Sequence, residues 1–129
     1  MAYVDIVTAL ALLQFTYFGM QVGGARGKYG VHAPAVTGNE IFERYFRVQQ
    51  NTLEQLLVFL PGLYLFARYL SPLWAAGLGA IYLIGRQVYS ATYVKDPKTR
   101  SVGFGLTFLP TMALVVGGLV GAVIHLVRP

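Results

Sequence analysis

Three polar side chains share one face of a long, otherwise apolar segment. Arg47, Asn51 and Glu54 are separated by four and then three residues, which places them on the same side of an α-helix. The residues after Glu54 are mostly apolar, so the polar stripe enters the segment from one end and stops. Arginine binds carboxylates through two parallel hydrogen bonds, and a glutamate can accept an ammonium group. The stripe therefore has the chemistry to hold a zwitterionic ligand.

A second polar stripe lies on the next apolar segment. It consists of four residues separated by four, three and four positions: Tyr82, Arg86, Tyr89 and Tyr93. Arg100 follows just before the last apolar segment. Ionisable groups inside a membrane span are costly and usually indicate a site. Together the two stripes predict a wet, arginine-rich cleft with one carboxylate and several phenols, suited to a ligand with more than one carboxylate.

Each of these residues also has a less specific explanation. Arg44 and Arg47 could extend to lipid headgroups, Tyr89 and Tyr93 could belong to an aromatic belt, and Glu54 could pair with a nearby arginine. Anchors and belt residues need not align in two facing stripes. The joint pattern therefore favours a binding site.

The segments that carry these stripes have the composition of membrane-spanning helices. The chain is 56% hydrophobic and only 12% charged, whereas a soluble domain carries roughly 25% charged residues. A span needs about 20 apolar residues. The sequence predicts an all-α, integral membrane four-helix bundle in one domain, residues 1–129, with helices at about 3–22, 43–69, 72–93 and 102–127. Glycines in the last two helices favour close packing: Gly77, Gly79, Gly85, Gly117, Gly118 and Gly121.

The charge distribution predicts the topology and restricts the partners. Basic residues gather in the connections after the first and third helices, so the positive-inside rule places both connections and the cleft on the cytoplasmic side. The net charge is +5, but the chain offers no soluble basic face for nucleic acid. We expect membrane lipids and a small anionic ligand instead. No cysteine and only two histidines are present, so we expect no metal site. The compact chain suggests a multi-pass protein of a bacterial inner membrane.

Two runs of the sequence resemble a known family. Residues 42–54, Phe-Glu-Arg-x-x-Arg-x-Gln-x-Asn-x-x-Glu, look like the second-helix signature of the MAPEG family, the membrane-associated proteins in eicosanoid and glutathione metabolism. Within this run, Asn-Thr-Leu-Glu is most similar to the microsomal glutathione S-transferase branch. Residues 85–100 resemble the third helix and following loop of that family. The resemblance implies a homotrimer that binds glutathione between neighbouring subunits near the cytoplasmic surface.

The resemblance also implies roles for individual residues. It suggests that glutathione is held by Arg47, Asn51, Glu54, Tyr89 and Tyr93, and Arg44 of the same motif is also expected to bind it. Arg26 and Gln49 match positions that contribute from the adjacent subunit, and Arg86 is expected to line the same cleft. Arg100 matches the arginine beside the glutathione sulfur, and is the expected catalytic residue.

The implied function is that of a membrane-bound glutathione S-transferase. Such an enzyme activates glutathione, its co-substrate, as a thiolate that attacks a hydrophobic electrophile dissolved in the membrane. The same thiolate could reduce a lipid hydroperoxide, which is a glutathione peroxidase activity. The leukotriene C4 synthase branch has an arginine and a tyrosine where this chain has Gly27 and Gln55, which argues against leukotriene synthesis.

Other functions compete with this one. A non-catalytic lipid- or glutathione-binding membrane protein of the same family is the main alternative, although the known example lacks part of the glutathione motif that this chain keeps. A small multidrug exporter also has four helices, but it depends on a buried acid in the first helix, where this chain has only Asp5 at the very start. A purely structural scaffold does not explain two aligned polar stripes.

Overall fold

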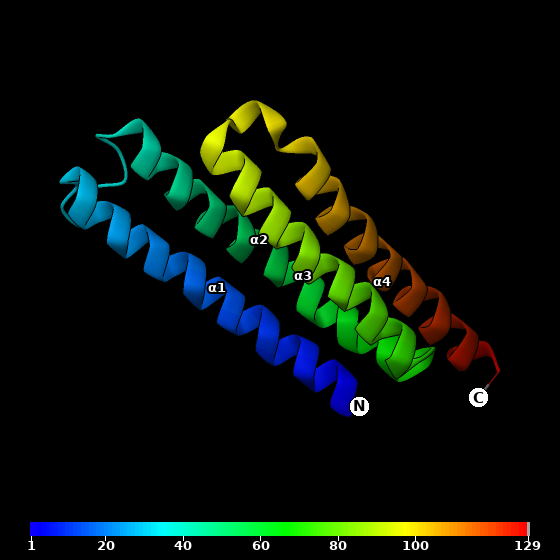
Figure 1. Ribbon diagram of the computed structural model, residues 1–129. Coiled ribbons are helices and arrows are strands. Elements are labelled where there is room, and N and C mark those ends of the chain that lie inside the picture. Colours follow the sequence, from blue (N-terminus) through cyan, green and yellow to red (C-terminus); the bar gives the residue numbers. More distant parts are fainter. Residues whose placement is uncertain (129) are drawn as a thin grey trace.

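The computed structural model describes residues 1–128, which form four long helices packed side by side (Figure 1). The helices are α1 (Ala2–Tyr29), α2 (Glu40–Tyr69), α3 (Pro72–Lys95) and α4 (Ser101–Val127), with a short 3-10 helix, η1 (Pro97–Thr99), before α4. No strand occurs within residues 1–128. The α1–α2 and α3–α4 connections lie at one end of the bundle, here called the loop end, and both termini lie at the other (Figure 1). The predicted all-α four-helix bundle is confirmed.

The outer surface of the bundle is apolar, as expected for a protein surrounded by lipid. Leu13, Leu109 and Leu126 are 65%, 69% and 79% exposed, and many other large hydrophobic side chains are exposed along the helices. A soluble monomer rarely leaves so much apolar surface in contact with water. Helix α1 and the segment Pro97–Val127 are each long and apolar enough to cross a membrane. The chain is therefore an integral membrane protein.

Helices α2 and α3 are less apolar because they carry the polar stripes. Their lengths are nevertheless sufficient for a span: α2 has 30 residues and α3 has 24. At about 1.5 Å per residue these helices are roughly 45 and 36 Å long, whereas the hydrocarbon layer is about 30 Å thick. Apart from Tyr82, both polar stripes occupy the loop-end halves, and the opposite halves are mostly apolar.

Helix α1 extends further than the sequence predicted. Its end was expected at Val22, before a pair of glycines, but the helix continues to Tyr29 and ends where Gly30 adopts a left-handed conformation with φ 68°. Glycine in a helix costs about 1 kcal/mol relative to alanine. Burial of Val22 and Ala25 against Phe42 of α2 offsets that cost, so packing decides where the helix ends.

Helix α2 begins three residues before the predicted position. The side chain of Asn39 accepts a hydrogen bond of 2.9 Å from the backbone N–H of Phe42, which is the usual arrangement of a helix N-cap. The cap satisfies an amide that the first turn would otherwise leave unpaired. It also places Glu40 and Glu43 in the first turn of α2, where the helix dipole favours negative charge.

Helices α3 and α4 touch backbone to backbone near the loop end. A Cβ atom added to Gly103 would lie 2.4 Å from the backbone of Tyr89, and one added to Gly85 would lie 2.7 Å from that of Leu106. Two of the glycines that were predicted to allow close helix packing do so: Gly85 lies against Leu106 of α4, and Gly118 lies against Leu65 of α2. A Cβ added to Gly77 would meet nothing within 4 Å, so this predicted packing glycine contributes no contact. Close approach of helices through small residues is typical of membrane proteins.

We predict that Gly103→Ala destabilises the protein. The added methyl group would collide with backbone atoms of Tyr89, which cannot rotate away, and overpacking of this kind costs about 1–3 kcal/mol. The midpoint of thermal unfolding, measured on detergent-purified protein, should fall by several degrees. Gly77→Ala is the matched control, because it adds the same methyl group to open space. Equal stability of the two variants would contradict the close α3–α4 contact.

Candidate functional site

Residues of both predicted stripes line one cavity near the loop end. Helix α2 contributes Arg47, Gln50, Asn51 and Glu54, helix α3 contributes Tyr89 and Tyr93, and Arg100 comes from the residue just before α4. The volume of this cavity, here called the polar cavity, is about 280 Å³. Tyr89 and Tyr93 stack with ring centroids 5.4 Å apart, which fixes one wall. Residues from α2, α3 and the connection before α4 thus meet at one cavity.

The charged groups of the polar cavity are not neutralised by the protein itself. Within residues 1–128 the sole ion pair is that of Arg44 with Glu40, with a nitrogen–oxygen distance of 2.8 Å. Arg47, Arg100 and Glu54 are therefore available to an incoming ligand. The two guanidinium groups match carboxylates, and the carboxylate of Glu54 matches an ammonium group.

An unsatisfied amide oxygen also points to a ligand. The Oδ1 atom of Asn51 is buried and has no hydrogen-bond partner in the described part of the chain. Buried polar atoms are normally paired, and each exception calls for an explanation. Since Asn51 lines the polar cavity, an N–H or O–H donor of a bound molecule would supply the missing partner.

The short connection between α3 and α4 places Arg100. The carboxylate of Asp96 accepts from the backbone N–H of Lys98 at 3.1 Å. The hydroxyl of Thr99 bonds the carbonyl oxygens of Asp96, at 2.7 Å, and Thr92, at 3.1 Å. These contacts fold η1 back over the end of α3. The close contact of Gly103 with Tyr89 then holds the first turn of α4, and with it Arg100, beside the cavity.

A second, less polar cavity adjoins the first. Its volume is about 430 Å³ and its lining combines three residues of the polar cavity with three from the start of α4: Asn51, Tyr89, Arg100, Ser101, Phe104 and Gly105. Phe104 is partly exposed on the outer surface, where lipid would lie. Arg100 therefore stands at the border between a charged cavity and a cavity that reaches the membrane side of the bundle. Such a border suits a reaction between a polar and a hydrophobic molecule.

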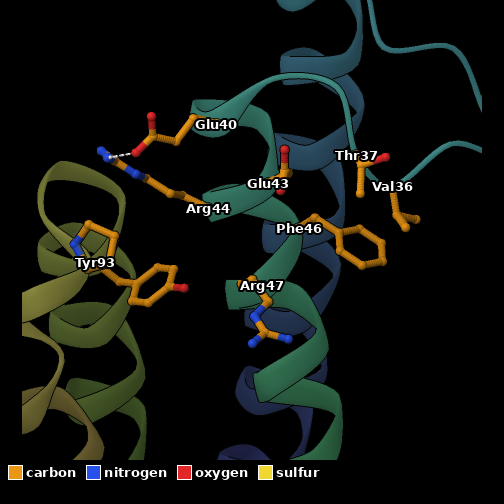
Figure 2. A pocket seen from close by; sticks show the side chains of 9 residues that line it. Val36, Thr37, Glu40, Glu43, Arg44, Phe46, Arg47 and Tyr93 are labelled. Atoms are coloured by element: carbon orange, nitrogen blue, oxygen red, sulfur yellow. Dashed lines mark hydrogen bonds and ion pairs between the residues drawn. The ribbon is translucent and has the colours of Figure 1, made fainter.

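A third cavity leads from the loop end toward the polar cavity. Figure 2 shows residues that line it, with Arg44 bonded to Glu40 near the top of the view and Arg47 below Glu43 and Phe46. Its volume is about 440 Å³. Arg47 and Tyr93 line this cavity as well as the polar cavity. The two are therefore neighbours, and a water-soluble ligand could approach the site from the loop end.

Arg44 is engaged in the structure of the bundle. Its Nη1 atom donates to the carbonyl oxygens of Val94, at 3.0 Å, and Lys95, at 3.3 Å, and its Nη2 atom pairs with Glu40. The carbonyl groups at the end of a helix have no partner within the helix. Arg44 therefore ties the start of α2 to the end of α3, and it lies outside the polar cavity.

Arg26, at the end of α1, and Gln49 of α2 both lie where α1 packs against α2. The Nη1 atom of Arg26 donates to the carbonyl oxygen of Ala35 at 2.6 Å, and its guanidinium group lies 4.9 Å from the ring centroid of Phe42. Gln49 packs against Gly19 of α1, because a Cβ on that glycine would lie 3.0 Å from the Gln49 amide nitrogen. Neither residue lines the polar cavity of its own chain.

Arg86 is fully buried behind the cavity instead of lining it. Its exposed fraction is 0%, its Nη2 atom donates to the hydroxyl of Thr52 at 2.9 Å, and its Nη1 atom to that of Thr107 at 3.5 Å. Sequence reasoning did not single out these threonines or Gly103. The sequence signal that could have indicated them was a threonine on the face that α2 or α4 turns toward α3, or a glycine on that face of α4.

Comparison with known proteins identifies the family. The model of the MAPEG family matches residues 4–120. The chain belongs to this family. It is 42% identical to human microsomal glutathione S-transferase 2 over 89% of this chain and 78% of the relative. It is 30% identical to mouse leukotriene C4 synthase over 96% and 83% of the two chains. An uncharacterised protein from the cyanobacterium Synechocystis is 54% identical over 88% of this chain and 83% of the relative.

We predict that neighbouring arginines of α2 have opposite roles. Arg44→Gln removes charged hydrogen bonds to the end of α3, each worth about 1.5–3 kcal/mol, reduced here because the group is partly exposed. It should lower the thermal unfolding midpoint. Arg47→Gln is the matched control, since Arg47 makes no ion pair in the described structure, and it should leave that midpoint unchanged. The reverse order of stabilities would refute this division of roles.

Proposed function

We propose that the chain is a membrane-bound glutathione transferase that activates glutathione as a thiolate and directs it at hydrophobic electrophiles. Family membership and the relatives named above support a glutathione-utilising membrane enzyme. The observation that carries the proposal is the polar cavity, which Arg47, Arg100 and Glu54 line without an ion-pair partner among residues 1–128.

The charges of the cavity complement those of glutathione. The tripeptide has two carboxylates, one ammonium group, two amide bonds and a thiol. Arg47 is available for a carboxylate, Glu54 for the ammonium group, and the unpaired oxygen of Asn51 for an amide N–H. The hydroxyl groups of Tyr89 and Tyr93 add hydrogen-bonding capacity. One carboxylate, the ammonium group and one amide N–H of the ligand thus each have a candidate partner in the cavity.

The proposed chemistry depends on Arg100 stabilising a thiolate. A cysteine-like thiol has a pKa near 8.5, so only a small fraction is ionised at pH 7, and the thiolate is the nucleophile. Lowering that pKa by two units requires about 2.7 kcal/mol, which is within the range of one charge-assisted hydrogen bond. The thiolate then forms a sulfur–carbon bond with an electrophile in the adjoining cavity, and the electron pair of the broken bond leaves with the displaced group.

The same thiolate could reduce a lipid hydroperoxide. Attack on the outer peroxide oxygen breaks the oxygen–oxygen bond and releases an alcohol after protonation, and a second glutathione then converts the oxidised sulfur to a disulfide and water. The adjoining cavity reaches the membrane side at Phe104, which would admit either class of lipid substrate. Product analysis with an electrophile and with a hydroperoxide separates the two activities.

We propose that the complete site forms in a homotrimer. Arg26 and Gln49 lie between α1 and α2, and neither lines the polar cavity of the same chain. Their positions fit the role implied by the family resemblance, in which a neighbouring subunit supplies both residues. We further propose a bacterial inner membrane as the location, with the loop end and its cavities on the cytoplasmic side, where basic residues are favoured.

A non-catalytic binding protein is the alternative that the same cavity would serve. It predicts saturable glutathione binding to detergent-purified protein without the ultraviolet absorbance of a thiolate at neutral pH. The transferase predicts both signals. Absence of binding at millimolar glutathione would refute the transferase and the glutathione-binding form of the alternative, and would leave only a lipid-binding protein.

We expect Arg100→Ala to abolish thiolate formation while leaving the fold intact. Arg100 is exposed and makes no ion pair within residues 1–128, so its loss removes little stabilising contact. The ultraviolet thiolate signal at pH 7 should fall at least tenfold, in line with a loss of about 1.4 kcal/mol or more. Lys98→Ala, which removes a nearby exposed charge, should retain the signal. A normal signal in the Arg100 variant would remove this residue from the mechanism.

We expect Glu54→Gln to weaken glutathione binding by about 10- to 100-fold. The substitution removes the carboxylate that would pair with the ammonium group, and charged hydrogen bonds contribute about 1.5–3 kcal/mol. Isothermal titration calorimetry would measure the change. Asp5→Asn, at the other end of the bundle, removes the same charge outside the site and should bind normally. Unchanged affinity in the Glu54 variant would assign Glu54 a structural role.

A further inference from the structure

A buried positive charge lies directly behind the polar cavity without a carboxylate to balance it. Arg86 is the largest fully buried side chain of the protein. The sequence has five acidic residues, all within the described residues, and none of them approaches Arg86 within 4.0 Å. A buried charge without an ionic partner is costly in a protein, and in a membrane span it usually marks a function.

The hydrogen bonds of Arg86 offset only part of that cost. The hydroxyl of Thr52 donates to the carbonyl oxygen of Val48 at 2.7 Å, and that of Thr107 to the carbonyl oxygen of Gly103 at 2.9 Å. Both hydroxyl hydrogens are therefore committed to their own helices, and the oxygen lone pairs face the guanidinium group. A guanidinium group has five N–H donors, and the Nε atom of Arg86 remains buried and unpaired. The network holds α2, α3 and α4 together but does not neutralise the charge.

The ring of Tyr89 lies between this charge and the polar cavity. The central carbon of the Arg86 guanidinium lies 4.4 Å from the centroid of the Tyr89 ring, and Tyr89 lines both the polar cavity and the adjoining cavity beside Phe104. A cation over an aromatic face is attracted by the ring electrons. Arg86 therefore fixes the orientation of Tyr89 from behind, and its positive potential extends through the ring into the site.

We propose that Arg86 is a positioning residue that holds Tyr89 and supplies a fixed positive charge behind the cavity, for which the bound anionic ligand is the counter-ion. With glutathione as that ligand, the inference rests on the proposed function. The charge acts on the anion through Tyr89 and not by direct contact. The empty protein then carries an electrostatic cost that ligand binding relieves, so the fold should gain stability when an anion binds.

The test compares loss of the charge with loss of a hydrogen bond to it. Arg86→Met removes the charge and keeps an apolar side chain, whereas Thr52→Val keeps the charge and removes one acceptor. For each detergent-purified variant, the thermal unfolding midpoint without ligand and the pH at which half of the bound glutathione is thiolate would be measured. We expect Arg86→Met to be at least as stable as the wild type without ligand and to raise that pH by about one unit, a tenfold loss of thiolate.

The threonine variant should show the opposite pattern. Thr52→Val is expected to lower the unfolding midpoint and to leave the thiolate titration unchanged, because the buried charge persists. If Arg86→Met is less stable than the wild type and titrates normally, Arg86 is only a structural residue and the inference fails. If Arg86→Met does not fold, Arg86→Lys is measured instead. If half of the bound glutathione is thiolate at the same pH as in the wild type, the inference is supported. If that pH is shifted although the charge is retained, the inference is overturned.

A separate measurement distinguishes failure of this inference from failure of the proposed function. If the wild-type protein does not bind glutathione, the proposed function is wrong. The inference is then judged with inorganic sulfate as the anion. A larger sulfate-induced rise of the unfolding midpoint in the wild type than in Arg86→Met supports it, and equal rises overturn it. General salt effects on stability apply to both proteins and cancel in the comparison.

Discussion

The contact of α3 with α4 at Gly103 and Gly85 is the constraint on which the site depends. No side chain separates the two backbones there, so the first turn of α4 lies directly on Tyr89. Arg100 precedes that turn and thereby reaches the cavity that α2 and α3 form. In lipid, helices gain no hydrophobic energy from association, and close packing replaces it as a driving force. The same contact therefore contributes to both stability and site geometry.

The electrostatics of the loop end follow from an excess of cations over acids. The chain has ten basic and five acidic residues, and the described structure contains a single ion pair. That pair lies within α2, between Arg44 and Glu40, while Arg44 also bonds carbonyl groups at the end of α3 and Arg26 bonds loop carbonyl groups. The cations around the cavity remain uncompensated. Unpaired charges within a membrane span usually indicate a functional site, and these cations suit the anionic ligand proposed above.

The adjoining cavities offer separate routes to the site for the two proposed substrates. Water-soluble glutathione would approach from the loop end, past Arg47, while a hydrophobic partner would arrive from the membrane at Phe104. Arg100 lines the boundary between them. The relatives include both a glutathione S-transferase and a leukotriene C4 synthase, so family membership alone does not select the hydrophobic substrate. That choice depends on the shape of the apolar side, where shape and not charge discriminates among substrates.

The amino-acid sequence determined the helices and most of the cavity residues on α2 and α3, because both follow from local periodicity, whereas Gln50 was not expected in the cavity. The lengths of the apolar segments specified the membrane spans. Spacings of three and four residues placed Arg47, Asn51 and Glu54 on one face of α2, and Tyr89 and Tyr93 on one face of α3. Only the tertiary structure decided which arginines reach the cavity. Arg44 and Arg86 stand in the same motifs, yet one bonds the end of α3 and the other is buried behind Tyr89. The end of α1 was likewise settled by packing against α2. Spacing along a helix gives the direction of a side chain, whereas its partner depends on how closely the neighbouring helix approaches.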